Sequence, residues 1–305
     1  MNFNEIIGNN DVKNNLEAIC KLNKIAHSYI FVGIQGIGKK LIAKEFSKKI
    51  LCLKEQNGCN YCKSCLEFET ENHPDFKIIV PDGKNIKIEQ IRDIQSKIYE
   101  KPIISLKKVY IIDDADLMTK EAQNCLLKTL EEPPNYIVII LIVSNESNLL
   151  NTIKSRCIKI AFDSLKEEEL KKFLNQENID NKILKRADGS IKKLIHIKEN
   201  IELYKKIEDE FFNIENRQLI DFLKTTETVS KNKEIINYIL DYINLIFYEK
   251  SNNNSCIVDF QKYMNCIQIV EKVKQILKQN GNFDMSIDYL FLKVWEEINE
   301  RYSRS

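Results

Sequence analysis

Apolar residues in the first half of the chain follow two alternating patterns. Short unbroken apolar runs predict buried strands, one ending at Val32 and others at 76–80, 109–112, 136–143 and 158–162. Between these runs, apolar residues recur every three or four positions, which predicts amphipathic helices. Strands that alternate with helices predict a parallel sheet covered on both faces. We therefore expect an α/β domain over residues 1–163.

The pattern changes after Phe162, because only helical periodicity follows. Ser164 and Glu167 have the spacing of a capping box, which predicts that a helix begins there. Short helices are expected as far as about residue 207 and longer ones beyond it, with a loop at 251–254. We therefore expect a small helical domain over 164–207 and an all-α domain over 208–305.

Composition narrows the class of protein. The 305 residues carry a net charge of +1, so no overall basicity indicates nucleic-acid binding. With 43% apolar and 30% charged residues, the composition is that of a soluble globular protein. The N-terminus has no signal-peptide pattern, and the longest apolar run, 136–143, is too short to span a bilayer. We expect a cytoplasmic protein of two or three domains.

A glycine-rich loop follows the first predicted strand and precedes a predicted helix. Gly33, Gly36 and Gly38 let the backbone curl so that successive N–H groups can hold phosphate oxygens, which Lys39 would also reach. The loop matches the template G-x-x-x-x-G-K-[ST] at seven of eight positions. Lys40 stands at the eighth position, where a hydroxyl would hold Mg²⁺. The context favours P-loop ancestry, whereas Lys40 argues against Mg²⁺–ATP chemistry.

Two carboxylates follow the strand predicted at 109–112. Asp113 stands where a carboxylate can hold Mg²⁺ beside a P-loop, and Asp114 stands where a base would orient water. The alternative is an acidic pair that only ends a strand and caps a turn. Their position after a buried strand in a P-loop protein favours the nucleotide-site interpretation.

Four of the nine cysteines cluster after the predicted P-loop helix, at Cys52, Cys59, Cys62 and Cys65. Gaps of two residues can place neighbouring thiolates on one tetrahedral ion, which predicts a structural zinc site. An iron–sulfur cluster is the alternative, but ferredoxin motifs continue as C-x3-C-P, and this chain does not. The other cysteines fall in helical or strand patterns and are expected to be packing residues: Cys20, Cys125, Cys157, Cys256 and Cys266.

Taken together, these segments resemble the AAA+ clamp-loader ATPases of bacterial DNA polymerase III. Residues 127–134, Leu-Lys-Thr-Leu-Glu-Glu-Pro-Pro, look specific to that group, and 113–116 resembles its Walker B segment. The cysteine insertion at 52–65 is similar to the group's zinc module. Ser155-Arg156-Cys157 looks like the motif whose arginine reaches into a neighbouring subunit's ATP site. The resemblance also implies that Asn145 lies at sensor 1 and Lys192 at sensor 2.

Three departures from the family pattern bear on the role of the chain. The motor subunits, gamma and tau, should have a P-loop Thr, a Walker B Glu and a sensor 2 Arg, where this chain has Lys40, Asp114 and Lys192. The resemblance therefore implies a non-hydrolysing subunit that supplies Arg156 in trans. Its implied partners are gamma/tau and delta in a heteropentamer that loads the sliding clamp on primed DNA. The alternatives are an active gamma-like ATPase and a zinc-stabilised interaction protein without a replicative role.

Overall fold

The computed structural model describes residues 2–54, 58–174, 181–253 and 257–299. The chain divides into two compact units, Met1–Lys192 and Lys193–Ser305, which are described separately below. The division at 163 and 207 into three domains stays a prediction. No described helix combines the length and apolar character that crossing a bilayer requires.

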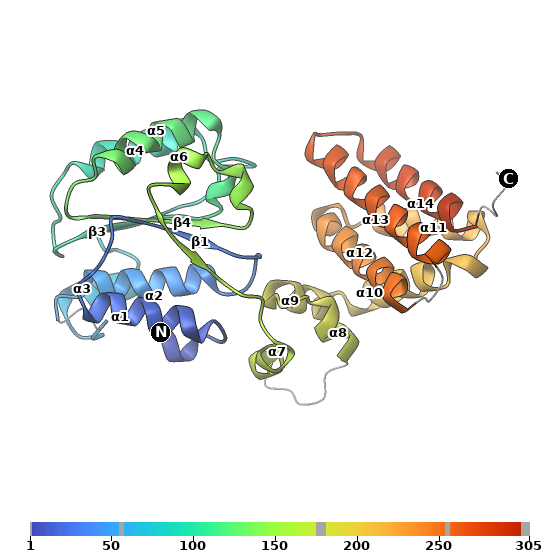
Figure 1. Ribbon diagram of the computed structural model, residues 1–305, viewed down its shortest axis with the longest axis horizontal. Helices are drawn as coiled ribbons and strands as arrows, with labels where there is room; N and C mark the ends of the chain where they lie inside the picture. Colours follow the sequence, from blue (N-terminus) through green and yellow to red (C-terminus); the bar gives the residue numbers. More distant parts are fainter. Residues whose placement is uncertain (1, 55–57, 175–180, 254–256, 300–305) are drawn as a thin grey trace. The chain divides into compact units, whose positions relative to one another are not determined.

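A five-stranded parallel sheet forms the centre of the first unit (Figure 1). Its strands are β1 Ser28–Val32, β2 Phe76–Ile79, β3 Lys108–Ile112, β4 Ile137–Val143 and β5 Ile158–Ala161. They lie in the order β2-β3-β4-β1-β5. Every residue of β3 and β4 is buried, as expected of strands covered on both faces. The expected α/β fold is confirmed.

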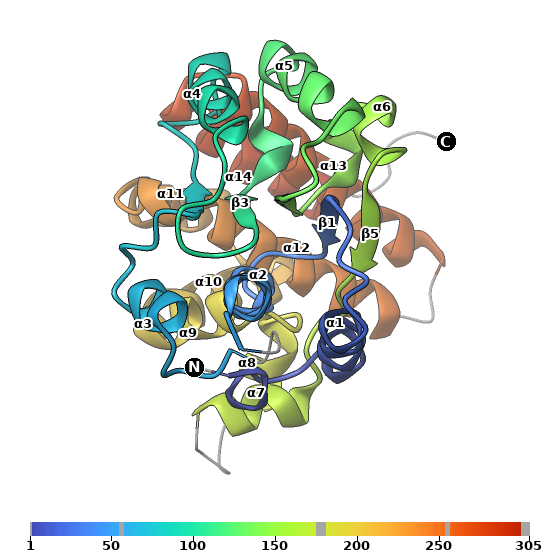
Figure 2. The same ribbon diagram turned by 90° about the vertical axis from the view of Figure 1, so that its left-hand side faces the viewer.

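Helices cover both faces of this sheet, as Figures 1 and 2 show. On one face lie α1 Asn10–Lys21, α2 Lys39–Leu51 and α3 Lys63–Glu69. On the other lie α4 Ile88–Ile98, α5 Lys120–Glu131 and α6 Asn151–Lys154. Thr119 caps α5, since its Oγ1 accepts a hydrogen bond from Ala122 N at 3.2 Å. The chain continues with α7 Glu167–Leu174, α8 Asn181–Arg186 and α9 Ile191–Glu199.

The expected capping box at Ser164 is wrong. Helix α7 begins at Glu167, and the Glu169 carboxylate accepts from Lys166 N at 2.8 Å. Leu165 is buried, and its N–H donates to Gly189 O at 3.0 Å, so a tertiary contact holds this backbone outside the helix. The tertiary contact therefore overrides a plausible local signal.

Within the described residues, every secondary-structure element of the second unit is a helix. It contains α10 Ile201–Phe212, α11 Leu219–Ser230, α12 Ile236–Asn253, α13 Ile257–Lys278 and α14 Phe283–Asn299. Phe211, Phe222 and Phe291 pack together in its core, with ring centroids 4.8 to 5.1 Å apart. The expected loop at 251–254 is wrong for 251–253, which continue α12. Residue 254 and Cys256 lie outside the described residues.

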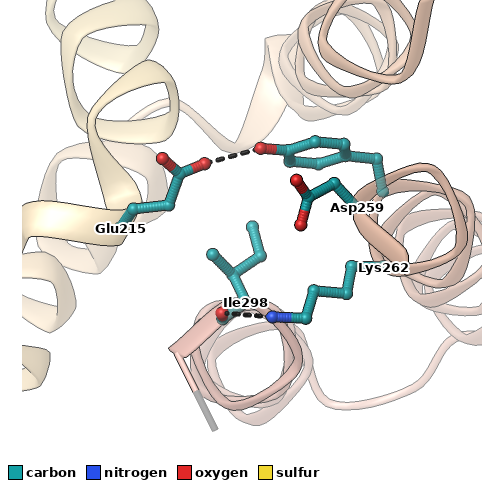
Figure 3. Close-up of a pocket in the computed structure, with 5 residues that line it drawn as sticks. Glu215, Asp259, Lys262 and Ile298 are labelled. Carbon is teal, nitrogen blue, oxygen red and sulfur yellow. Dashed lines mark hydrogen bonds between the residues drawn. The ribbon is translucent and has the colours of Figure 1, made fainter. Parts of the chain in front are cut away.

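A polar pocket of about 310 Å³ lies within this second unit (Figure 3). Glu215, in the short helix η4 (Ile214–Asn216), accepts from Tyr263 Oη at 2.5 Å and from Lys250 Nζ at 3.0 Å. Burial alone would raise the pKa of Glu215, but these two hydrogen bonds and the charges of Lys250 and Lys262 together outweigh it and hold the pKa below its usual range. Lys262 Nζ donates to Ile298 O at 3.3 Å. The pocket residues thus connect η4, α13 and α14, and Lys250 adds a link from η4 to α12.

Candidate functional site

The glycine loop runs from the end of β1 to the start of α2. Gly36 and Gly38 have φ of 79° and 90°, in the left-handed region that glycine adopts without strain. A Cβ added at Gly36 would lie 2.4 Å from Ser190 Oγ and 2.5 Å from Lys192 Cβ. Only glycine therefore permits this close approach.

Residues 190–192 are hydrogen-bonded to the loop. Ser190 Oγ donates to Gln35 O at 2.7 Å, and Ile191 N donates to Gly36 O at 2.9 Å. Ser190 is fully buried where the two segments meet. The structure thus brings Lys192, more than 150 positions away in sequence, to the glycine loop.

Lys39 is buried at the start of α2, with 6% of its surface exposed. Its ammonium donates to Gly33 O at 2.5 Å and to Ile34 O at 2.7 Å. Burial lowers the pKa of Lys39, and the nearby carboxylates of Asp114, Asp116 and Asp113 act in the opposite direction. The ammonium thus belongs to the loop's own hydrogen-bond network.

Lys40 pairs with the acid that follows β3. Its Nζ lies 2.9 Å from Asp113 Oδ2, and the two side chains are 44% and 17% exposed. A cation in the first turn of a helix is disfavoured by the helix dipole, so the carboxylate offsets an unfavourable placement. Sequence reasoning placed both residues at the nucleotide site but did not predict that they pair.

The acidic segment after β3 is held by a residue to which sequence reasoning gave no role of its own. Asp116, in η2 (Ala115–Leu117), accepts from Ser144 N and Asn145 N, each at 3.2 Å. Asp114 has φ of 49°, and burial, with the charges of Asp113 and Asp116, raises its pKa. The Asn145 amide oxygen accepts from Ser147 N at 3.0 Å, which caps η3 (Glu146–Asn148). The signal for Asp116 was its place as the third acid of the segment.

Arg156 lies between α6 and β5. Its Nη2 is 2.8 Å from Glu131 Oε1, and its Nη1 donates to Thr152 O at 2.8 Å. Its backbone oxygen accepts from Ser28 Oγ at 2.8 Å. The guanidinium is thus held by α5 and α6 and the backbone by β1, and none of these contacts involves the glycine loop.

The four clustered cysteines can hold one metal ion. Their sulfur atoms all lie within 4.8 Å of one another, and Cys59 Sγ is 4.0 Å from Cys65 Sγ. Thiolates at about 2.3 Å from zinc in a tetrahedron are about 3.8 Å apart, so the arrangement fits such an ion. Backbone N–H groups of Cys59, Cys62 and Cys65 donate to sulfurs within the cluster at 3.4 to 3.5 Å. Donation of this kind favours the thiolate form that a metal requires.

A buried polar network that sequence reasoning missed supports the cysteine cluster. Ser64, between two of the cysteines, donates to Leu51 O at 2.7 Å and contacts His73 Nε2 at 2.9 Å. Asp75 N donates to His73 Nδ1 at 3.1 Å, and burial lowers the pKa of His73, opposed by Asp75 and Glu67. The Asp75 carboxylate accepts three backbone N–H bonds, from residues 103–105, at 2.7 to 2.9 Å. The signal available in the sequence was His73-Pro74-Asp75, a histidine and an acid on either side of a proline, directly before β2.

This parallel sheet, with a glycine loop after β1, acids after β3 and a distant segment folded onto the loop, defines a P-loop protein of the AAA+ type. The chain belongs to the family described as "DNA polymerase III, delta subunit", whose sequence model matches residues 8–166.

Relatives with two different names match the chain. The DNA polymerase III subunit delta' of Bacillus subtilis is 37% identical over 158 residues, which are 52% of this chain and 48% of that protein. The DNA polymerase III subunit gamma of Buchnera aphidicola subsp. Schizaphis graminum is 29% identical over 97% of this chain and 90% of that protein. The Haemophilus influenzae tau/gamma subunit is 32% identical, but the chain spans only 29% of its length. The first two relatives thus carry different subunit names.

The fold of this chain is similar to that of a solved structure. A gamma subunit-related protein of Thermotoga maritima superposes with a TM-score of 0.50 at 18% identity, over 93% of this chain and 99% of that one. The likeness includes the helical region that follows the sheet.

Proposed function

We propose that this chain is a delta-prime-type subunit of a bacterial DNA polymerase III clamp loader. In this role it hydrolyses no ATP itself and supplies Arg156 to the ATP site of an adjacent gamma/tau subunit. The observation that carries the first half of the proposal is the ion pair between Lys40 and Asp113, 2.9 Å long.

The ion pair bears on metal binding. P-loop NTPases hold Mg²⁺ between a P-loop hydroxyl and a carboxylate at the end of a neighbouring strand. Here the Lys40 ammonium stands in place of the hydroxyl and pairs with the Asp113 carboxylate. A divalent cation at this position would be repelled by the ammonium and would have to displace it from the carboxylate. Asp114, one methylene shorter than Glu, and Lys192 in place of Arg support the same conclusion. Gly33, Gly36, Gly38, Lys39 and Asn145 are the remaining parts of this degenerate site.

Arg156 supports the second half of the proposal. A guanidinium is planar and permanently charged, so it suits a γ-phosphate and the charge that develops during transfer. Arginines supplied in trans accelerate other NTPases by about 10³- to 10⁵-fold. A subunit without metal chemistry of its own has a use for such an arginine only at a neighbour's site.

The wider assignment follows from the same proposal. We assign 1–163 as the α/β domain, 164–207 as a helical lid and 208–305 as an oligomerising collar. The partners are gamma/tau and delta in a heteropentamer, with contact to the sliding clamp and primed DNA through that complex. Because bacterial DNA is replicated in the cytoplasm, the proposal places the protein there.

We assign zinc to the cysteine cluster. Four thiolates complete a tetrahedral shell and leave no position for substrate, so the ion is structural. When bound, it would join the end of α2 to α3 through Cys52, Cys59, Cys62 and Cys65.

Reconstitution tests the proposed function. The chain is purified alone and with gamma/tau and delta, and Mg²⁺-dependent ATP hydrolysis is measured for each combination. We expect the chain alone to show negligible turnover, to join the complex, and to raise clamp- and DNA-stimulated hydrolysis by gamma/tau. Failure to associate would instead favour a zinc-stabilised interaction protein.

An active gamma-like ATPase is the second candidate. It is favoured by the gamma relative that aligns with 97% of the chain and by the retained Lys39. Magnesium-dependent turnover by the purified chain, abolished by Lys39→Ala, would establish this candidate and reject the first.

A further inference from the structure

The Arg156 guanidinium is held from two directions on the first unit. Thr152 O accepts from Nη1, and Glu131 Oε1 lies within ion-pair distance of Nη2, each at 2.8 Å. The backbone of the same residue is fixed separately, because its oxygen accepts from Ser28 Oγ and its N–H donates to Ile153 O. Both the origin and the direction of the side chain are therefore defined.

Glu131 contributes little to the stability of its own helix at this position. It is the last residue of α5, where the negative end of the helix dipole disfavours a carboxylate. Its side chain is 49% exposed and that of Arg156 is 34% exposed, and ion pairs this open contribute little to stability. The pair is therefore better explained by what it does to the arginine than by what it adds to folding.

We propose that Glu131 is a positioning residue for Arg156. This inference rests on the proposed function, in which Arg156 enters a neighbour's ATP site. An arginine side chain has many rotamers, so it loses considerable entropy when it is ordered. If that ordering takes place only in the transition state, it raises the activation free energy of the reaction. A carboxylate that already holds one edge of the fork removes part of that freedom beforehand. Of the five N–H donors of the guanidinium, these two contacts use two and a longer one to Ser155 Oγ, at 3.5 Å, uses a third, so donors remain for phosphate oxygens.

The chain offers a matched control beside Glu131. Glu132 has the same charge and is also exposed. Within the described part of the chain its side chain makes no hydrogen bond or ion pair. Glu131→Gln and Glu132→Gln therefore remove the same charge one residue apart, but only the first replaces an ion pair with Arg156 by a weaker, uncharged contact.

The experiment uses the full chain in a reconstituted complex with gamma/tau, delta, sliding clamp and primed DNA. We expect Glu131→Gln to lower kcat of the stimulated ATPase by about three- to tenfold, as for the ordering of one long side chain. The KM for ATP should stay unchanged, because the arginine acts on the transition state. Glu132→Gln should match the unmodified chain, and a lower rate for Glu131→Gln should come with unchanged complex assembly.

A double variant separates positioning from a structural role. If Glu131 acts through Arg156, adding Glu131→Gln to Arg156→Ala should cause no further loss. A further loss of the same size, or equal rates for Glu131→Gln and Glu132→Gln, would overturn the inference while leaving the proposed function intact. If Arg156→Ala alone has no effect, the proposed function fails, and this outcome is read from that single variant.

Discussion

Lys40 and Asp113 form an ion pair that joins the first turn of α2 to the end of β3, with 2.9 Å between Nζ and Oδ2. The lysine brings a positive charge to the carboxylate that would otherwise be available to a metal. Asp113 thus already has a counter-ion from within the protein.

Replacing this lysine tests the consequence. Lys40→Thr restores a hydroxyl to the loop and releases Asp113, so we expect Mg²⁺-dependent nucleotide binding to appear or to strengthen. Hydrolysis should stay low, because Asp114 remains. Binding of a fluorescent ATP analogue, with Mg²⁺ and with EDTA, measures the change. Lys44→Thr is the control, since Lys44 lies one turn further along α2 and pairs with Glu71 instead. Equal binding by the two variants would contradict the expectation.

Arg156→Ala should leave folding, metal content and complex assembly nearly unchanged. Clamp loading by the assembled complex should fall by about tenfold or more, because a trans arginine stabilises the transition state. Arg156→Lys should rescue poorly, since a point charge does not reproduce the fork. Lys159→Ala is a control, because Lys159 is a nearby exposed cation that pairs with Glu146. Loading at the unmodified rate by the Arg156→Ala complex would make Arg156 an ordinary surface residue.

Purified protein should contain about one zinc per chain, because four clustered thiolates bind this ion tightly. Cys62→Ser should lower metal content and the stability of the first unit. Cys125→Ser should change neither, because Cys125 lies outside the cluster and donates to Gln95 Oε1, a bond that a serine can make. Elemental analysis and thermal unfolding measure both effects. Iron, or a visible cluster absorbance, would show that the zinc assignment is wrong.

Asp75→Asn should destabilise the first unit by about 1–3 kcal/mol, because one of the oxygens that accept three backbone N–H bonds becomes a donor. Release of zinc to a colorimetric chelator during urea unfolding reports this unit. The single tryptophan, Trp295, lies in α14, so its fluorescence reports the second unit, whose transition should not move. Asp82→Asn, at an exposed position, is the control. A shift of both transitions would show that the effect is not local.

The sequence predicted the sheet well because burial and pattern agree there. The sequence runs that form β3 and β4 are almost entirely apolar, and every residue of both strands is buried. Local signals failed where distant residues decide the backbone, as at Leu165, whose N–H is bound by Gly189. At Ser251 the hydroxyl donates to Tyr248 O, so a residue expected in a loop is satisfied inside α12.

The candidate site was predictable as a set of residues but not as a set of contacts. Gly36 and Lys192 were both named from the sequence, yet only the fold shows that they touch. The pairing of Glu131 with Arg156 joins the end of α5 to the segment between α6 and β5, 25 positions further on, and no spacing rule encodes it. The roles of Asp75 and His73 depend on residues 103–105, which lie about 30 positions further along the chain and contact both side chains.

Helix α2 has the glycine loop at one end and the first cysteine at the other. It begins at Lys39 and ends at Leu51, immediately before Cys52. Thirteen residues at 1.5 Å each make a rod about 20 Å long. A helix of this length moves as one rigid piece. A shift of its Cys52 end on metal loss would therefore also displace Lys39 and Lys40 at the other end. Metal occupancy and loop geometry would then be two measurements of the position of a single helix.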